Sequence, residues 1–383
     1  MPATTRFTHP GLPEPPALYL AFELSNRTWK LAFSTGLGQK ARIRSIPARD
    51  LEALEREITA ARRRFRLDDS VALICCYEAG RDGFWLHRFL SAQPYRHNLV
   101  VDSASIDVNR RERRLKTDRI DVLKLLSMLA RYHNGESAVW SIVHVPSPEA
   151  EDARHIHREL LTLKAERTRV TNRIKGLLVA QGLSAHSLAQ GFGDQLDDLR
   201  LWDGSSLPPR LHQRLLREWQ HRNQLQERIR LVERLQGEQL ELASSDPAIS
   251  MVRQLMTLKG IGLQSAWLFT FEFFAWRNIQ SRHQITALAG LAPSPYQSGD
   301  EARDLGISKA GSSSVRAMAI QIAWGWVRFQ PDSELTRWFE RRFAHGGRRM
   351  RAIGIVALAR RLLIELWRFL QTGTLPEGAI ASP

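Results

Sequence analysis

The first hundred residues of the chain alternate between short apolar runs and longer charged runs. Three runs rich in β-branched and aromatic residues follow one another closely, at Ala17 to Leu24, Thr28 to Ser34 and Ala41 to Ile46. Their length and the polar turns between them predict an antiparallel meander. The pattern then predicts a charged helix from about Ala48 to Phe65, an apolar strand from Val71 to Tyr77, a helix near Gly83 to Ala92, a short strand from Asn98 to Val101 and a helix from about Thr117.

The predicted order of these elements is βββαβαβα. Three antiparallel strands come first, and helices then alternate with strands that are apolar throughout, as parallel strands buried on both faces are. This arrangement is typical of the ribonuclease H-like nuclease fold, so we expect an α/β domain of that class over residues 17–147, after a proline-rich leader at 1–16. A fold alone does not establish an activity, which must be argued from particular residues.

From Pro148 onward the apolar residues recur at helical spacing. One stripe consists of Ile156, Leu160, Leu163, Val170, Ile174 and Leu177, and a second of Trp219, Leu225, Ile229, Val232 and Leu235. A stretch rich in Gly, Ser, Asp and Pro separates the two, so the pattern predicts an antiparallel helical hairpin or coiled coil over residues 148–245. A packed spacer and an arm for dimerisation or for spanning nucleic acid are both open interpretations.

We expect a third, mainly α-helical region over residues 246–372, followed by a tail at 373–383. It holds six of the eleven Trp residues and ends in a helix from about Ile353 to Leu370. Between Glu301 and Arg368 there are 13 Arg or Lys residues and 6 Asp or Glu residues. This region is therefore predicted to carry a concentrated positive surface.

The whole chain is strongly basic. Lys and Arg total 55 against 40 Asp and Glu, a formal net charge of +15, and the sequence pI is about 10.6. Polyanions such as DNA and RNA are the expected partners.

Cysteine usage and hydropathy indicate a cytoplasmic protein. The two cysteines, Cys75 and Cys76, are adjacent on a predicted strand and would point to opposite faces, so we expect reduced thiols. No window approaches the roughly 18 uninterrupted apolar residues of a membrane helix. The start of the chain has no apolar segment of the kind that a signal peptide requires. We therefore expect no membrane partner.

Four carboxylates stand where a ribonuclease H-like fold gathers acidic residues. Glu23 lies near the end of the first strand and Glu78 follows the most apolar strand, and the carboxyl ends of adjacent strands bring such residues close together. Asp118 and Asp121 are three residues apart at the start of a helix and share one face. Like charges this close repel unless a cation lies among them, and hard oxygen ligands suit Mg²⁺ or Mn²⁺. A pair of such ions can stabilise the attacking and leaving oxygens of a phosphodiester.

Each of these acidic residues also has a purely structural interpretation. Asp118 would favour the helix macrodipole, Asp121 would pair with Arg114 or Lys124, and Glu78 would end a strand. Taken jointly, in this strand order, the four residues favour metal binding.

Two basic segments are candidates for phosphate binding. The first surrounds the start of the predicted helix and consists of Arg110, Arg111, Arg113, Arg114, Lys116 and Arg119, for which a solvated basic loop is the structural alternative. The second is Leu258-Lys259-Gly260-Ile261-Gly262, between two apolar helical runs. It resembles a helix-hairpin-helix motif, in which Lys259 and the backbone at Gly260 and Gly262 would approach a DNA phosphate. A plain turn between helices fits this segment equally well.

A serine precedes a glycine in a stretch that we expect to be a non-helical loop. Ser298 has the hydroxyl of a possible nucleophile, and Lys309 and Arg316 follow it with the positive charge that an attacked phosphodiester requires. Most loop serines cap helices or form turns, which is the structural alternative for Ser298.

Several blocks of this sequence together resemble one protein family. They are Tyr77-Glu78-Ala79-Gly80, Lys116-Thr117-Asp118-Arg119-Ile120-Asp121, Gly290-Leu291-Ala292-Pro293, Ser298-Gly299 and Ile307-Ser308-Lys309-Ala310-Gly311. In this order and separation they resemble the DEDD transposases of the insertion-sequence family called "one-ten", which are relatives of the Piv DNA invertases. The likeness runs from about residue 17 to residue 372.

The resemblance implies a RuvC-like N-terminal domain, a coiled-coil connection and a C-terminal transposase domain whose serine attacks DNA. It implies that Glu23, Glu78, Asp118 and Asp121 form an acidic tetrad that binds Mg²⁺, and that Ser298 forms a covalent phosphoserine link. It further implies a noncoding bridge RNA that selects target and donor DNA, and dimers that pair into tetramers in which one subunit's tetrad meets another's serine. The family's first acidic residue is usually Asp, and Glu23 is longer by one methylene, on the order of 1.3 Å.

Three hypotheses follow from the sequence. The first is an RNA-guided DNA recombinase that uses Ser298 with the Mg²⁺-binding tetrad. The second is a RuvC-like, metal-dependent junction nuclease that uses only the tetrad and water. The third is a non-catalytic nucleic-acid-binding protein derived from a transposase.

Overall fold

The chain divides into two compact units, Met1–Val145 and Pro146–Pro383. The structure is a computed structural model, and it describes residues 16–106, 117–183, 191–242, 245–298 and 301–382.

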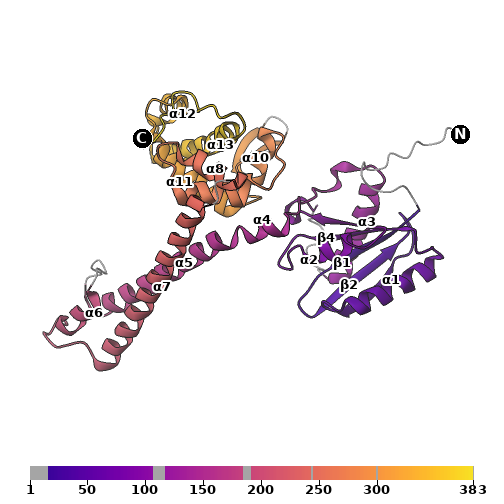
Figure 1. The fold of residues 1–383 in the computed structure, drawn as a ribbon, viewed down its shortest axis with the longest axis horizontal. Helices are drawn as coiled ribbons and strands as arrows, with labels where there is room; N and C mark the ends of the chain where they lie inside the picture. The colour runs from indigo at the N-terminus through magenta and orange to yellow at the C-terminus, as the bar shows by residue number, and fades with distance from the viewer. Residues whose placement is uncertain (1–15, 107–116, 184–190, 243–244, 299–300, 383) are drawn as a thin grey trace. The chain divides into compact units, whose positions relative to one another are not determined.

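The first unit is built on one five-stranded mixed sheet (Figure 1). Its elements are β1 (Ala17–Glu23), β2 (Thr28–Ser34), β3 (Arg42–Pro47), α1 (Leu51–Phe65), β4 (Ala72–Glu78), α2 (Trp85–Ser91), β5 (Arg96–Val101), the 3₁₀ turn η1 (Ser103–Ser105), α3 (Asp118–His133) and the 3₁₀ turn η3 (Ser137–Val139). The strand order is β3-β2-β1-β4-β5; β1, β2 and β3 pair antiparallel, whereas β4 and β5 continue parallel to β1. The predicted order βββαβαβα is confirmed, and the topology is compatible with a ribonuclease H-like core.

Helices cover both faces of this sheet. Alternate residues of a strand point to opposite faces, so Leu20 and Phe22 of β1 pack in the cluster that includes α1 and α2, whereas Tyr19 and Ala21 pack in the cluster that includes α3. Strands β1 and β4 are therefore buried on both sides, and this is why their sequences are continuous apolar runs.

The second unit contains a long antiparallel pair of helices (Figure 1). Its first elements are α4 (Pro148–Asp152), α5 (His155–Val179), α6 (Phe192–Gln195), the 3₁₀ turn η4 (Leu196–Asp198) and α7 (Pro209–Leu242). Lys164 pairs with Glu233 at 2.8 Å and Arg173 pairs with Glu218 at 2.9 Å, so later residues of α5 meet earlier residues of α7. The predicted antiparallel hairpin is confirmed, except that Leu235 is 41% exposed instead of buried.

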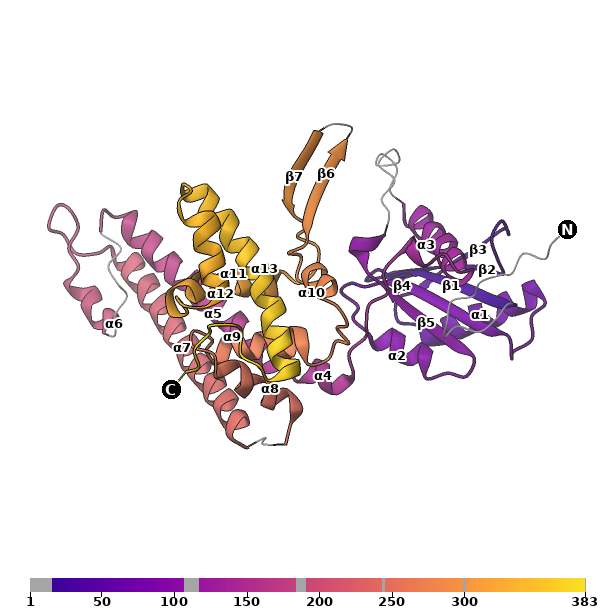
Figure 2. The ribbon, with the colours of Figure 1, turned by 90° about the horizontal axis from the view of Figure 1, so that it is seen from above.

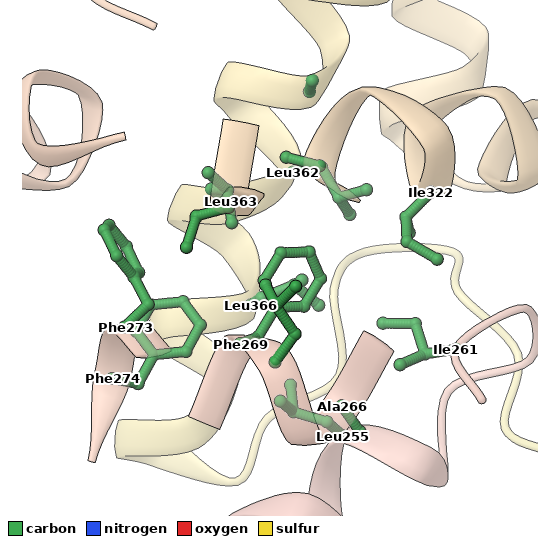
Figure 3. Packing of buried hydrophobic residues seen from close by; sticks show 14 of the residues in the cluster. Leu255, Ile261, Ala266, Phe269, Phe273, Phe274, Ile322, Leu362, Leu363 and Leu366 are labelled. Atoms are coloured by element: carbon green, nitrogen blue, oxygen red, sulfur yellow. The ribbon is translucent and has the colours of Figure 1, made fainter. Parts of the chain in front are cut away.

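The rest of the second unit is a helical body around one large apolar cluster (Figure 3). Its elements are α8 (Pro247–Met256), α9 (Leu263–Leu268), the π-helical segment η5 (Phe269–Phe274), α10 (Arg282–Leu288), β6 (Pro293–Ser298), β7 (Glu301–Ile307), α11 (Ser313–Phe329), α12 (Glu334–Phe339), the π-helical segment η6 (Glu340–Ala344) and α13 (Arg348–Thr372). Phe269 of η5 packs in this cluster with Leu363 and Leu366 of α13. The predicted late helix is the larger part of α13.

The segment after α13 returns to the turn between α8 and α9. Leu258 and Ala381 form an isolated β-bridge. The buried Gln330 side chain donates to the carbonyl oxygens of Lys259 and Ile380, at 2.8 Å each, and accepts from the Ile380 N–H at 2.7 Å. The segment predicted as a tail is therefore hydrogen-bonded to the helical body. The Gln330 amide bonds to its backbone at Ile380, and the Ser382 N–H donates to the carbonyl oxygen of Thr257.

The loop expected around Ser298 is instead a pair of strands. β6 and β7 pair antiparallel and extend away from the helices of the second unit (Figure 2). The expectation of a loop was wrong. In the described part of the chain β6 and β7 join no larger sheet, and a two-stranded ribbon does not require apolar residues at alternate positions, so the sequence pattern did not reveal these strands. Pro293 and Pro295 flank a register shift, a position where a missing backbone N–H disturbs the ladder little.

No helix within the described ranges is both long and apolar enough to cross a membrane.

Candidate functional site

Glu23 and Glu78 end neighbouring parallel strands at matching positions. Phe22 of β1 is the register partner of Tyr77 of β4, and each glutamate is the next residue along its strand. Matching positions of parallel strands project to the same face. Residues two positions earlier on both strands pack against α3, so the two glutamates belong to the face that α3 covers. The structure thus brings these two predicted residues together.

One cavity of about 280 Å³ is lined by both glutamates and by residues 79–82. Within that segment Arg81 is exposed, and Asp82 forms a salt bridge to Arg49 with 3.1 Å between Oδ1 and Nη2. Two carboxylates that share a cavity offer the hard oxygen atoms that Mg²⁺ and Mn²⁺ prefer. The chemistry of these two side chains therefore suits the metal that the sequence predicts.

Helix α3 runs opposite to β1 and β4. At its end, His133 Nδ1 lies 2.7 Å from the hydroxyl of Tyr19 near the start of β1. Nearer its beginning, the Leu125 carbonyl oxygen lies 3.9 Å from the Sγ of Cys76, two residues before the end of β4. The first turn of α3 is therefore directed toward the carboxyl edge of the sheet.

Asp118 and Asp121 both belong to that first turn. Thr117 caps the helix, because its side chain accepts from the Ile120 N–H at 3.4 Å. Asp118 is exposed and Asp121 is half-buried. In the part of the chain that the structure describes, no salt bridge joins Asp121 to Lys124, which was one structural alternative for this residue.

The four carboxylates do not form one compact cluster. Among the residues with described side chains, no three His, Cys, Asp or Glu lie close enough together to hold a metal ion. Glu23 and Glu78 share a cavity, and Asp118 and Asp121 lie on the helix over the same face. Joint binding of an ion by all four residues stays a prediction.

Two buried thiols precede Glu78 on β4. Burial raises the pKa of Cys75 to about 12 and also raises the pKa of Cys76. Both are free cysteines, as expected, and both stay protonated. Both side chains are fully buried, so neither thiol is accessible to a substrate at this site.

Ser298 is the last residue of β6 and pairs with Glu301 of β7. Its backbone thus lies where the two strands meet the turn, in the second unit. The side chain of Ser298 is outside the described part of the structure.

The base of this hairpin is formed by the two sequence blocks on either side of it. Gly290 has φ +66°, and a Cβ there would lie 2.2 Å from the carbonyl oxygen of Ala310. Gly311 has φ +97°, and a Cβ there would lie 2.2 Å from the carbonyl oxygen of Leu288. Only glycine permits both the left-handed backbone and this close approach. The Gly-Leu-Ala-Pro and Ser-Lys-Ala-Gly blocks therefore hold the two ends of the hairpin together.

Comparison with known proteins places the chain among transposases. Residues 252–336 match the family described as "Transposase IS116/IS110/IS902 family". The protein named "Putative transposase y4rJ" of Sinorhizobium fredii is 39% identical over 378 residues, which cover 95% of this chain and 94% of that protein. The chain belongs to this transposase family. The transposase is also 29% identical over 184 residues to "Transposase for insertion sequence element IS1328" of Yersinia enterocolitica, covering 47% of this chain and 52% of that protein.

The predicted phosphate-binding residues of the transposase have different environments. Arg110, Arg111, Arg113, Arg114 and Lys116 lie outside the described residues, whereas Arg119 is exposed on the first turn of α3. Lys259 is exposed in the turn between α8 and α9. In the same turn Gly260 has φ +96° and lies against Phe329, whose atoms would be 3.3 Å from an added Cβ. Gly262 is the N-cap residue of α9. A helix-hairpin-helix role for this turn stays a prediction.

Lys309 and Arg316 differ in what their side chains can bind. Lys309 is exposed, and its backbone N–H donates to the carbonyl of Gly290 at 3.1 Å. Nη1 of Arg316 donates to the carbonyl oxygens of Ala289, at 3.3 Å, and Lys309, at 3.1 Å. The Arg316 guanidinium is thus engaged with the backbone at the base of the hairpin.

Two residues of the carboxyl edge were not identified from the sequence. Arg81 lines the cavity of the two glutamates, three residues after Glu78. Asp102 directly follows β5, whose last residue, Val101, accepts from the N–H of Ala79 at 2.8 Å. An acidic residue that directly follows an apolar strand was the available signal for Asp102, and it is the same signal that identified Glu78.

Proposed function

We propose that this transposase cuts and rejoins the DNA strands of an insertion sequence through Ser298, with Mg²⁺ held by Glu23, Glu78, Asp118 and Asp121. The observation that supports it best is the cavity shared by Glu23 and Glu78 at the carboxyl edge of the sheet. The first turn of α3 is directed toward the same edge.

In the proposed reaction the hydroxyl oxygen of Ser298 forms a bond to a DNA phosphorus. The bond from phosphorus to one deoxyribose oxygen breaks, the serine proton is lost to a base, and the leaving oxygen takes up a proton. A second DNA hydroxyl reverses these changes when it attacks the phosphoserine link, so the strand is rejoined without an external energy source. Exposed Lys309 follows the hairpin that carries the serine and supplies positive charge for the phosphate.

The acidic residues contribute oxygen ligands at the edge of the first unit. Bound Mg²⁺ would supply Lewis-acid stabilisation of the charge that develops on the reacting phosphate oxygens. Glu78 and Glu23 would hold it from two strands, and Asp118 and Asp121 from the start of α3. Arg81 beside them offers a guanidinium that can orient a phosphate.

A bridge RNA is the proposed guide, and a dimer that assembles to a tetramer is the proposed active form. Both follow from the family likeness, and the net charge of +15 is suited to holding two kinds of nucleic acid. Binding to either should weaken steeply as the salt concentration rises, because each neutralised phosphate releases counterions.

The serine mechanism is tested by trapping the covalent intermediate. Full-length protein is incubated with Mg²⁺, labelled element-end DNA and the element's noncoding RNA, and adducts are resolved by denaturing electrophoresis. The proposal expects an adduct at Ser298 in the wild type, none in Ser298→Ala, and a normal yield in Ser294→Ala, a control on the same strand. Cleavage that survives in Ser298→Ala would exclude the serine as the nucleophile.

A metal-dependent junction nuclease is the alternative, since every predicted metal ligand belongs to the first unit. It expects Ser298→Ala to cut a branched DNA normally and Asp121→Asn to lose cutting. A wild-type protein that binds DNA but neither cuts it nor forms an adduct would instead be the non-catalytic binder.

A further inference from the structure

The helical pair of the second unit contains a cavity that the proposed chemistry does not use. Its volume is about 550 Å³, and the residues that line it include Trp219, Arg222, Asn223, Gln226, Glu227 and Arg230 of α7. Ligand pockets in proteins commonly measure roughly 300–1,000 Å³, so the cavity is large enough for a small organic group.

Arg222 is the chemically distinctive residue of this cavity. Its guanidinium carbon lies 4.7 Å from the ring centre of Trp219, so one face of the cation is stacked on the indole. Its Nη1 donates to the Asn223 side-chain oxygen at 3.3 Å. Its buried Nε has no hydrogen-bond partner among the described residues. Burial and the nearby Arg167 lower the pKa of Arg222.

The surrounding charged groups do not neutralise this cation. Arg167 donates to the neutral amide oxygen of Gln226 at 2.8 Å. Glu227 is already paired with Arg230 at 2.6 Å. Within the described ranges, no carboxylate forms a salt bridge with Arg222 or Arg167. A partly buried cation without a paired carboxylate is costly, so the Arg222 guanidinium that lines this cavity is suited to an anionic ligand.

The aromatic wall of the cavity is held firmly. Phe192 meets Trp219 edge-on, with 5.2 Å between ring centres. The backbone at Gly193 approaches the indole so closely that a Cβ there would lie 2.8 Å from it. Trp219 is buried and fixes the Arg222 guanidinium beside it, whereas Arg222 and the side-chain amides of Asn223 and Gln226 are polar groups of the kind that bind unpaired nucleotides.

We propose that this cavity binds one unpaired nucleotide of a single-stranded RNA or DNA segment. The Arg222 guanidinium, which forms no salt bridge within the described ranges, attracts the phosphate, and the amide of Asn223 contacts the edge of the base. A duplex fits poorly, because its bases are paired and stacked and none of them is free to enter the cavity. Binding here requires neither Ser298 nor a metal ion, so it can fail or succeed independently of the proposed catalysis.

The test measures binding of the full-length protein to short labelled strands by fluorescence anisotropy. A 15-nucleotide RNA, a DNA of the same mixed sequence and the matching DNA duplex are titrated without divalent metal. Arg222→Ala and Arg222→Lys remove the planar group, and Asn223→Ala removes the amide. Arg217→Ala is the matched control, because Arg217 is an exposed arginine of α7 that does not line the cavity. Unfolding curves of each variant separate lost binding from lost folding.

We expect Arg222→Ala and Arg222→Lys to weaken binding of at least one single strand roughly tenfold, since a hydrogen bond to a charged group is lost. Asn223→Ala should weaken it less, and Arg217→Ala by less than about twofold, with duplex binding unchanged in all four. The ratio of the dissociation constants measured for the RNA strand and the DNA strand shows which of the two is the ligand. Crosslinking from 4-thiouracil-containing RNA or 4-thiothymine-containing DNA should mark the peptide that contains residues 219–226.

Equal weakening by Arg222→Ala and Arg217→Ala would mean that only the overall charge matters, and would overturn the proposal. So would failure of the wild type to bind either single strand. Unchanged strand binding in Arg222→Ala, combined with altered sedimentation, would assign the cavity to a contact with another protein chain and would likewise overturn it. Ser298→Ala should bind both strands as the wild type does.

Discussion

Arg316 donates a hydrogen bond from Nη1 to the carbonyl oxygen of Lys309, 3.1 Å away, and so connects α11 to the base of the β6–β7 hairpin. The same nitrogen reaches the carbonyl oxygen of Ala289 on the other side of that base. One guanidinium therefore joins both blocks that flank Ser298. It acts on the serine through the backbone that carries it, which makes Arg316 a positioning residue in the proposed reaction.

Replacing Arg316 should loosen the base of the hairpin. We expect Arg316→Ala to lower the free energy of unfolding by about 1–3 kcal/mol, because two backbone carbonyls lose a charged donor. Denaturant unfolding followed by tryptophan fluorescence measures this change. Arg351→Ala, an exposed arginine of α13, is the control and should change stability by less than about 0.5 kcal/mol. Unchanged stability with weaker DNA binding would instead make Arg316 a direct phosphate ligand.

The close approach at Gly311 should not tolerate a side chain. An added Cβ would lie 2.2 Å from the backbone oxygen of Leu288 at φ +97°, so Gly311→Ala should cost on the order of 3 kcal/mol or more. Gly306→Ala is the matched control: φ is +87° there but no atom lies within 4 Å, so only backbone strain of about 1–2 kcal/mol applies. Equal losses in the two variants would contradict the close packing of the hairpin base.

Metal addition should stabilise the first unit through its shared glutamates. We expect Mg²⁺ to raise the free energy of unfolding of the wild type, by about 2.7 kcal/mol at a hundredfold excess over its dissociation constant. Glu78→Gln should lose most of this gain. Without metal the variant should be at least as stable as the wild type, because one of two neighbouring negative charges is gone.

Thermal unfolding at increasing Mg²⁺ concentrations provides the measurement. Glu52→Gln, at an exposed site on α1, should respond to Mg²⁺ as the wild type does. A full response in Glu78→Gln would remove this glutamate from the proposed metal site.

Stability should fall in mild acid because of a buried histidine. Burial lowers the pKa of His157 to about 4, outweighing the raising effect of Glu272, and both ring nitrogens lack hydrogen-bond partners among the described residues. As the pH falls from 6.5 toward 4, the unfolded chain takes up a proton that the folded chain does not. The contribution of neutral His157 to the free energy of unfolding is therefore complete above about pH 6.5. It is lost progressively as the pH falls to 4, by on the order of 3 kcal/mol in total.

His157→Leu should lack this loss. The difference in unfolding free energy between pH 7 and pH 4.5 should be smaller in His157→Leu than in the wild type. His155→Leu, two residues away and exposed, should keep the wild-type dependence. Parallel pH profiles for the wild type and His157→Leu would show that another group is responsible.

The local sequence pattern was sufficient to predict an element wherever burial of that element requires apolar residues. β1 and β4 are buried on both faces, so apolar side chains are required at nearly every position and the strands are visible in the sequence. The α5–α7 pair was visible for the same reason, because one face of each helix is buried. The predicted apolar stripe of α7 was wrong at Leu235, which is exposed. The buried residue at this point is the next one, Gln236, whose amide oxygen accepts a hydrogen bond from the side chain of Gln264 in α9 at 2.8 Å. A buried amide with a tertiary partner leaves no hydrophobic signal.

By itself, the sequence determined the element order of the first unit, the helical pair, the basic character and the family, because each depends on composition, periodicity or a spaced set of residues. Only the tertiary structure decided that Glu23 and Glu78 share a cavity, that a two-stranded hairpin carries Ser298, and that the Arg316 guanidinium contacts backbone carbonyls. These relations depend on which backbone groups meet across distant segments of the chain. Hydrogen bonds and glycine contacts between such segments impose no periodic pattern on the sequence.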